Sequence, residues 1–195
     1  LSKFFRPLNK SKSGMKKRNF SAIAAIVFTL LFSCNSNDKK KEIEMKDIKL
    51  KEQTVTYKVD SASMNSYLVY DENTDGPRPV VFVIHEWWGL NDYIKQESER
   101  IFKTLGNANV ISIDLYDQKV ASTRDSAAKY MQGVKTARAE NIIKGALAYV
   151  GKNANIATIG WCFGGGWSMQ STLLAAKQSK ACVMYYGMPE EKNDK

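Results

Sequence analysis

The sequence predicts an α/β fold with a doubly wound, mostly parallel sheet and an N-terminal antiparallel hairpin. Short apolar runs such as residues 80–84 (VVFVI) alternate with segments of helical composition, which is typical of parallel strands buried on both faces. Segment 53–59 alternates polar and apolar residues with period two, and segment 65–70 lies close enough to pair with it as a hairpin. An apolar run at 156–159 leads through a glycine-rich turn into helix-forming residues at 168–177.

The other elements have recognisable starts and stops. Asn91 or Asp92 can cap a helix that runs to about Leu105, where residues 106–107 (GN) end it. Residues 122–125 (STRD) open a further helical stretch. The remaining predicted elements are strands at 108–113 and 181–186 and a helix at 137–149. Because ligands bind outside the carboxyl ends of the strands in such a sheet, the residues that follow each strand are the first candidates for a site.

The charge of the chain is unevenly distributed. The net charge is +9 over 195 residues, but residues 1–49 carry 12 Lys/Arg and 4 Asp/Glu, which leaves residues 50–195 close to neutral. The basic excess therefore belongs to the N-terminal segment, and no nucleic-acid partner is expected. The three cysteines and the single histidine show no metal-ligand spacing, so the sequence predicts no metal and no cofactor.

The N-terminal segment resembles a bacterial lipoprotein signal. Basic residues 16–18 precede an apolar stretch at 22–32, which is shorter than the ~20 residues of a spanning helix, and Cys34 closes it as the expected lipidation site. We divide the chain into 1–34, an over-extended start plus signal peptide; 35–49, a flexible tether; and 50–195, the folded domain. The implied location is an exported, membrane-anchored lipoprotein at the periplasmic face or cell surface. An ordinary secretory signal and a short uncleaved anchor are the alternatives.

Residues 160–164 (GWCFG) have the pattern of a nucleophile elbow, with cysteine where serine is more common. Such a turn strains its central residue, and side chains at Gly160 and Gly164 would collide with the neighbouring strand and helix. Cys162 would then lie at the N-terminus of a helix, where the dipole favours a thiolate and free N–H groups can receive an oxyanion. The alternative is a glycine-rich turn with a buried structural cysteine.

Three blocks together resemble the dienelactone hydrolases (carboxymethylenebutenolidases) of the α/β-hydrolase fold. They are 85–91 (HEWWGLN), 113–116 (IDLY) and 160–165 (GWCFGG). The resemblance runs from about Gln53 to Pro189. It implies a hydrolase that acts on a small lactone or ester, in which Cys162 attacks the carbonyl and forms an acyl thioester that water hydrolyses.

The resemblance also implies roles for the neighbouring residues. The oxyanion would be held by the backbone N–H groups of Trp87 and Phe163, and Glu86 would lie close enough to accept the thiol proton. Trp87, Trp88 and Tyr116 would line the substrate pocket, whereas Asp114 is expected to be structural. In the members that degrade dienelactones a substrate-binding arginine follows the Asp-Leu-Tyr block. Here residues 117–119 (DQK) stand there, so a carboxylated lactone is not favoured.

The second half of a catalytic triad is missing from these residues. No histidine follows Cys162, and the only later acids are Glu190, Glu191 and Asp194. The sole histidine, His85, is predicted to be a structural loop residue, with a role as replacement base as the alternative. We therefore expect a C-terminally truncated member that lacks the last strands and helices and is inactive as it stands. A decayed, non-catalytic relative is the other explanation.

Two other functions are compatible with parts of the pattern. One is a non-catalytic binding lipoprotein that keeps the fold as a scaffold. The other is a class I glutamine amidotransferase-like domain, which also uses Gly-x-Cys-x-Gly, although residues 53–70 and 85–91 fit it poorly. Thiol reactivity distinguishes them, because an activated Cys162 is expected to react much faster than Cys182, which is predicted to be an inert core thiol.

Overall fold

The computed structural model describes residues 48–59, 61–74 and 76–188. In chain order the elements are β1 (Leu50–Val59), β2 (Ala62–Asp71), β3 (Val80–Ile84), α1 (Asp92–Leu105), β4 (Asn109–Ile113), α2 (Arg124–Gly133), α3 (Thr136–Val150), β5 (Ile156–Trp161), α4 (Phe163–Ala175), a short 3₁₀ helix η2 (Ala176–Gln178) and β6 (Ser179–Tyr185). The predicted signal peptide with Cys34 and most of the predicted tether lie outside the described residues.

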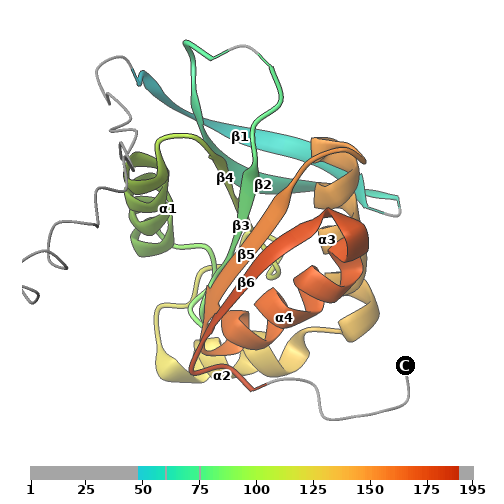
Figure 1. The fold of residues 1–195 in the computed structure, drawn as a ribbon. Helices are drawn as coiled ribbons and strands as arrows, with labels where there is room; N and C mark the ends of the chain where they lie inside the picture. The colour runs from blue at the N-terminus through green and yellow to red at the C-terminus, as the bar shows by residue number, and fades with distance from the viewer. Residues whose placement is uncertain (1–47, 60, 75, 189–195) are drawn as a thin grey trace, which may run out of the picture. The chain divides into compact units, whose positions relative to one another are not determined.

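The described strands form one sheet of order β1-β2-β4-β3-β5-β6 (Figure 1). β1 pairs antiparallel with β2, and β2 pairs antiparallel with β4, whereas β4, β3, β5 and β6 run parallel. The predicted hairpin and the predicted mostly parallel α/β sheet are therefore confirmed.

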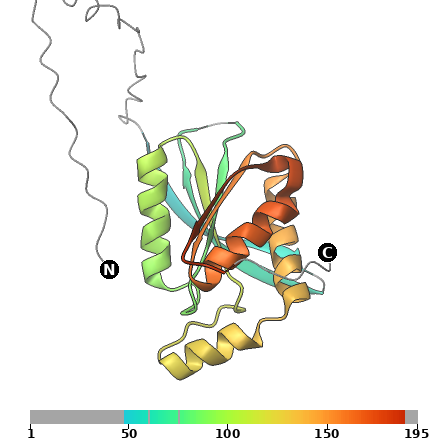
Figure 2. The same ribbon diagram turned by 60° about the horizontal axis from the view of Figure 1, so that its bottom comes forward.

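Helices cover both faces of this sheet, with α1 on one face and α3 and α4 on the other (Figure 2). β3 shows why its sequence is apolar throughout. Val81 and Val83 pack in the cluster on the α1 face, and Phe82 and Ile84 pack in the larger cluster on the α3 and α4 face. All five residues of β3 are buried, so each side chain of the strand contributes to one of the two cores.

The helix termini follow the residues that predicted them. The side chain of Asn91 accepts a hydrogen bond from the N–H of Ile94, and Gly106 ends α1 in the left-handed conformation with φ 67°. α2 begins with a capping box between Thr123 and Ser126. α4 begins earlier than the helix-forming run at 168–177 indicated, because the glycine-rich turn already forms its first turn.

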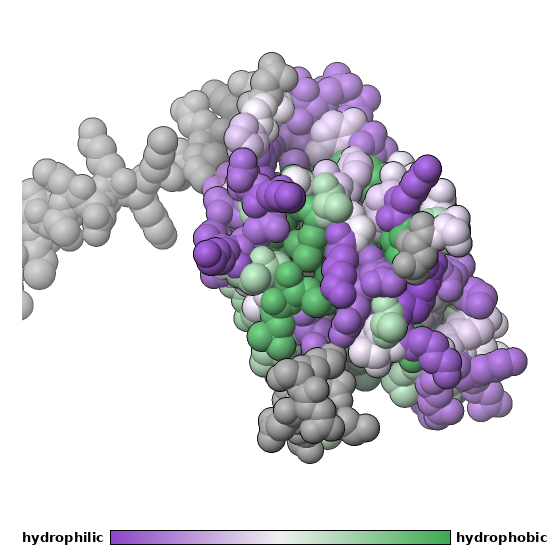
Figure 3. Space-filling model, turned by 90° about the vertical axis from the view of Figure 1, so that its right-hand side faces the viewer, coloured by the Kyte–Doolittle hydropathy of each residue, from purple (hydrophilic) through white to green (hydrophobic). Residues whose placement is uncertain are grey.

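β6 is the edge strand of the described sheet, and most of its side chains are exposed. Cys182, predicted to be a buried core thiol, is exposed on this strand, so that prediction is wrong. An apolar composition did not reveal that the strand lies at an edge, where one side has no neighbour to bury it. Figure 3 shows apolar side chains at the surface on this side of the molecule. None of the described helices is long and apolar enough to cross a bilayer.

Candidate active site

Cys162 lies between the end of β5 and the start of α4, in the turn that the glycine pattern predicted. Its backbone has φ 55° and ψ −122°, a strained conformation for a residue with a side chain. Its N–H donates to the carbonyl of Tyr185 at 3.0 Å, and its own carbonyl accepts from the N–H of Gly165 at 2.9 Å. The strain is thus held by hydrogen bonds to β6 on one side and to the first turn of α4 on the other.

Gly160 and Gly164 permit the close approach that builds this turn. A Cβ at Gly160 would overlap the carbonyl of Gly164, and a Cβ at Gly164 would overlap the carbonyls of Ile84 and His85. The predicted role of both glycines is confirmed. The first turn of α4 therefore packs directly against the end of β3, which brings Cys162 to the loop that carries Glu86 and Trp87.

The backbone donors predicted for the oxyanion lie on these two segments. Phe163 is the first residue of α4, where N–H groups have no partner within the helix. Trp87 follows β3, and its N–H makes no hydrogen bond to a described residue. The ring of Trp87 packs against that of Trp88 at a centroid distance of 5.2 Å.

His85 is fully buried, and both of its ring nitrogens are engaged. Nδ1 lies 2.6 Å from the carbonyl of Glu86, and Nε2 accepts the N–H of Leu115 at 3.0 Å. Nδ1 therefore carries the proton, and burial lowers the pKa of His85 to about 4, which keeps the ring neutral. The carboxylate of Asp114, 3.8 Å from Nε2, makes no ion pair with a neutral ring. In this arrangement His85 orders the loop after β3 and has no free nitrogen to serve as a base.

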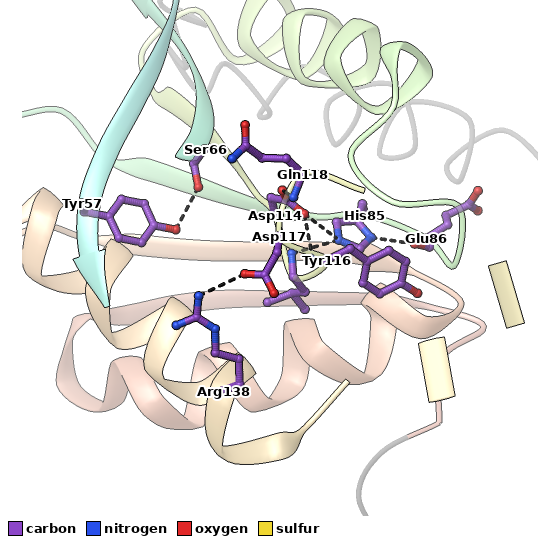
Figure 4. Close-up of polar contacts among 10 residues, drawn as sticks. Tyr57, Ser66, His85, Glu86, Asp114, Tyr116, Asp117, Gln118 and Arg138 are labelled. Atoms are coloured by element: carbon purple, nitrogen blue, oxygen red, sulfur yellow. Dashed lines mark hydrogen bonds and ion pairs between the residues drawn. The ribbon is translucent and has the colours of Figure 1, made fainter. Parts of the chain in front are cut away.

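Asp114 fixes the loop after β4 in a similar way. Its two carboxylate oxygens accept the N–H groups of Tyr116, at 2.8 Å, and Gln118 (Figure 4). Burial raises the pKa of Asp114, and these two backbone hydrogen bonds oppose that rise. The carboxylate holds a loop in which Asp117 and Gln118 have positive φ angles of 53° and 66°. This geometry agrees with the structural role expected for Asp114.

The carboxylate of Glu86 is hydrogen-bonded to Tyr186, whereas the sequence analysis expected it close to the thiol of Cys162. Its Oε1 accepts the hydroxyl of Tyr186 at 2.8 Å, and among the described contacts it makes no hydrogen bond to Cys162. That hydrogen bond is the main reason why the pKa of Tyr186 rises to about 12, and the charge of Cys162 adds to the rise. Glu86, Tyr186 and Cys162 thus lie in one electrostatic environment. Tyr186 is a site residue that the sequence analysis missed.

Tyr116 is buried beside the elbow. Its ring lies 4.6 Å from that of His85, 5.4 Å from that of Phe163 and 5.9 Å from that of Tyr130. Burial, and to a lesser extent the charge of Cys162, raise the pKa of its hydroxyl. Tyr116 also lines a cleft of about 540 Å³ between the loop after β4 and α2. Neither Cys162 nor Trp88 lines this cleft, so the substrate-pocket roles of Tyr116 and Trp88 stay predictions.

The comparisons with known proteins decide the family. Residues 64–195 match the dienelactone hydrolase family. The chain belongs to that family. This assignment agrees with the three sequence blocks and favours the hydrolase over the class I glutamine amidotransferase. A search of the curated proteins found no match.

Several solved structures have a similar fold. A dienelactone hydrolase-like promiscuous phosphotriesterase, P91, from metagenomic libraries is 25% identical with a TM-score of 0.60, covering 73% of this chain and 62% of its own. A Klebsiella pneumoniae protein assigned provisionally to the dienelactone hydrolases is 21% identical with a TM-score of 0.63, covering 74% and 64%. A cold-adapted esterase from an Arctic intertidal metagenomic library is 14% identical with a TM-score of 0.55, covering 69% and 60%. The chain thus spans less than two thirds of the length of these relatives.

One departure from the family pattern has a structural counterpart. The arginine expected shortly after the Asp-Leu-Tyr block is absent, but Arg138 of α3 reaches the same loop, where its Nη2 lies 3.0 Å from Asp117 (Figure 4). Nothing local in the sequence pointed to Arg138, because 21 residues separate the two partners. The carboxylate of Asp117 offsets its charge, so Arg138 does not replace the missing substrate-binding arginine.

Proposed function

We propose that this protein is a hydrolase of small esters or lactones that uses Cys162 as its nucleophile. The observation that carries the proposal is the strained backbone of Cys162 at the start of α4. A non-glycine residue in that conformation persists only where the surrounding structure holds it, and such residues cluster at active sites. At Cys162 the strain coincides with a thiol that lies at the first turn of α4.

The proposed reaction begins with attack of the Cys162 sulfur on the ester carbonyl carbon. The carbonyl oxygen becomes an oxyanion, which the N–H groups of Trp87 and Phe163 stabilise. When the carbonyl re-forms, the bond to the leaving oxygen breaks. The leaving group takes that electron pair and a proton from solvent, and the thiol proton passes to Glu86. The product is an acyl thioester on Cys162, which water then hydrolyses to the acid and the free thiol.

The two halves of this reaction have different needs. Cysteine depends least on a base, because some thiolate exists near neutral pH. We therefore propose that acylation proceeds in this chain, with Glu86 taking the thiol proton once it leaves Tyr186. Hydrolysis of the thioester needs a base for water, and the only histidine in the sequence, His85, is neutral and fully engaged. The 195-residue chain should accordingly acylate once and turn over slowly.

Reaction of the 195-residue chain with p-nitrophenyl acetate tests this proposal. We expect a burst of p-nitrophenol of about one equivalent, a slow steady state, and a mass increase of one acetyl group on the peptide containing Cys162. Cys162→Ala should abolish the burst without changing the fold. An acetylated Cys162→Ala variant, or no acylation of the natural chain, would support a non-catalytic binding protein instead.

We also propose that Cys34 carries a lipid that anchors the protein to a membrane face. The basic, apolar and cysteine-ended order of residues 15–34 supports it. When the protein is expressed from Met15 in a Gram-negative host, we expect it in the membrane fraction, and Cys34→Ser should trap the precursor. Unmodified protein found wholly in the cytoplasm would exclude the anchor.

A further inference from the structure

The hydroxyl of Tyr116 is a buried donor with no acceptor. Tyr116 is 4% exposed, and its hydroxyl oxygen makes no hydrogen bond to any described residue. Buried polar side-chain atoms nearly always have a partner, so an exception calls for an explanation. One explanation is that the acceptor belongs to a ligand.

The side chain of Tyr116 cannot turn away to find another partner. Its backbone N–H is tied to Asp114, and its ring is enclosed by the rings of His85, Phe163 and Tyr130. In Figure 4 the ring lies beside His85, and the hydroxyl points away from the ion pair of Asp117 with Arg138. The hydroxyl is therefore fixed in position and buried, and it has no hydrogen-bond acceptor among the described residues.

Its position is next to the nucleophile. The ring of Tyr116 contacts Phe163, the residue that follows Cys162 and offers one of the two oxyanion donors. Burial, and to a lesser extent the charge of Cys162, raises the pKa of the Tyr116 hydroxyl, so the hydroxyl keeps its proton at neutral pH. A protonated phenol in this position can donate a hydrogen bond to a substrate that is bound at Cys162.

We propose that Tyr116 is a catalytic residue that donates a hydrogen bond to the leaving oxygen of the ester or lactone. The inference rests on the proposed acylation of Cys162. The two backbone N–H groups of Trp87 and Phe163 already serve the carbonyl oxygen, which leaves the second ester oxygen as the acceptor without a donor. In the structure both nitrogens of His85 are engaged and the hydroxyl of Tyr186 donates to Glu86, whereas the hydroxyl of Tyr116 has no acceptor among the described residues.

In this step the sulfur of Cys162 forms its bond to the carbonyl carbon, and the bond from that carbon to the leaving oxygen breaks. The leaving oxygen departs with the electron pair, and its growing negative charge strengthens the hydrogen bond from Tyr116. The alcohol takes its proton from solvent, so Tyr116 ends the step protonated. The donor matters most for alkyl esters and lactones, whose alkoxides are poor leaving groups, and least for p-nitrophenyl esters.

The dependence of the acylation rate on the leaving group tests this role. We would measure acylation of Cys162 in the full chain with p-nitrophenyl, phenyl and trifluoroethyl acetate, for the natural chain, Tyr116→Phe and the matched control Tyr130→Phe. In Tyr116→Phe the ratio of the p-nitrophenyl to the trifluoroethyl rate constant should rise by about tenfold or more, as expected when a hydrogen bond to a developing charge is lost. In Tyr130→Phe this ratio should stay as in the natural chain.

The outcomes separate the inference from the function on which it rests. If p-nitrophenyl acetate does not acylate Cys162 in the natural chain, the proposed function fails. If acylation occurs but Tyr116→Phe slows all three esters equally, the function stands and the role of Tyr116 is overturned. If Tyr116→Phe does not fold, a fluorinated tyrosine at position 116 keeps the ring and strengthens the donor. It should then favour trifluoroethyl acetate, and an unchanged ratio would overturn the inference.

Discussion

Two neighbouring regions at the carboxyl ends of the strands differ in how their polar atoms are satisfied. Around His85 and Asp114 each ring nitrogen and each carboxylate oxygen has a described partner. Around the elbow, the thiol of Cys162 and the hydroxyl of Tyr116 have none among the described residues. In the first region the polar groups hold loops in place. In the second region the polar groups are available to bind a substrate. The hydrogen bonds thus distinguish residues of the three sequence blocks that have a structural role from residues that are available for a reaction.

Gly164→Ala should cause the largest loss of stability, because Gly164 lies in the elbow and packs against the backbone of Ile84 and His85. The added Cβ would overlap the carbonyls of Ile84 and His85, and backbone on both sides leaves no room to relax. We expect a loss of about 4 kcal/mol or more in the free energy of unfolding, or no folded protein. Urea denaturation followed by circular dichroism measures it.

Gly133→Ala is the matched control. A Cβ at the end of α2 meets no atom within 4 Å, so alanine should stabilise the helix by up to about 1 kcal/mol. Equal stability of the two alanine variants would show that the elbow is not as tightly packed against β3 as the structure has it.

His85 should make the stability depend on pH. Its pKa is lowered from 6.5 to about 4 in the folded state, so the unfolded chain binds a proton that the folded chain refuses. Neutral His85 makes its full contribution to the free energy of unfolding above pH 6.5. This contribution, about 3 kcal/mol in total, is lost as the pH falls from 6.5 toward 4. Urea denaturation between pH 7 and pH 4 measures the loss.

The control for this prediction is His85→Asn, which has no titrating ring. This variant should be less stable at pH 7 but should lack the extra slope between pH 6.5 and 4. Asp114 titrates in both proteins, and burial raises its pKa, so its contribution has the opposite sign. If the two proteins lose stability in parallel, His85 is not held neutral.

The sequence predicted the features that depend on local pattern. β3 has the predicted bounds of 80–84 because every one of its residues is buried, and Asn91 and Gly106 end α1 as expected. The elbow was predictable because Gly160 and Gly164 are required by the turn itself. Such features need only residues that are neighbours in the chain.

Contacts between distant segments were not predictable in the same way. The hydroxyl of Tyr186 meets Glu86 across 100 residues, and Arg138 reaches Asp117 from another helix. The exposure of Cys182 depends on the order of the strands, which composition does not reveal. The orphan hydroxyl of Tyr116 could be recognised only when all of its neighbours were placed.

The described thiols, Cys162 and Cys182, differ in the same way: Cys182 has hydrogen-bond partners and Cys162 has none among the described residues. The smallest predicted effect is a change in the alkylation rate of Cys182. Burial alone would raise the pKa of Cys182, but hydrogen bonds from Thr172, Thr158 and Ser168 outweigh it and lower the pKa. Ser168 Oγ lies 3.7 Å from the sulfur, so Ser168→Ala should slow alkylation of Cys182 by iodoacetamide about two- to tenfold at pH 7. Peptide mass spectrometry would follow both thiols at once, and the rate of alkylation at Cys162, which has no such partner, should not change.

Ser171→Ala is the control, because the Ser171 hydroxyl donates to the carbonyl of Trp167 within α4 and not to the sulfur. An equal slowing of both thiols by Ser168→Ala would mean that the variant changes access to the whole edge of the sheet and not the thiolate of Cys182.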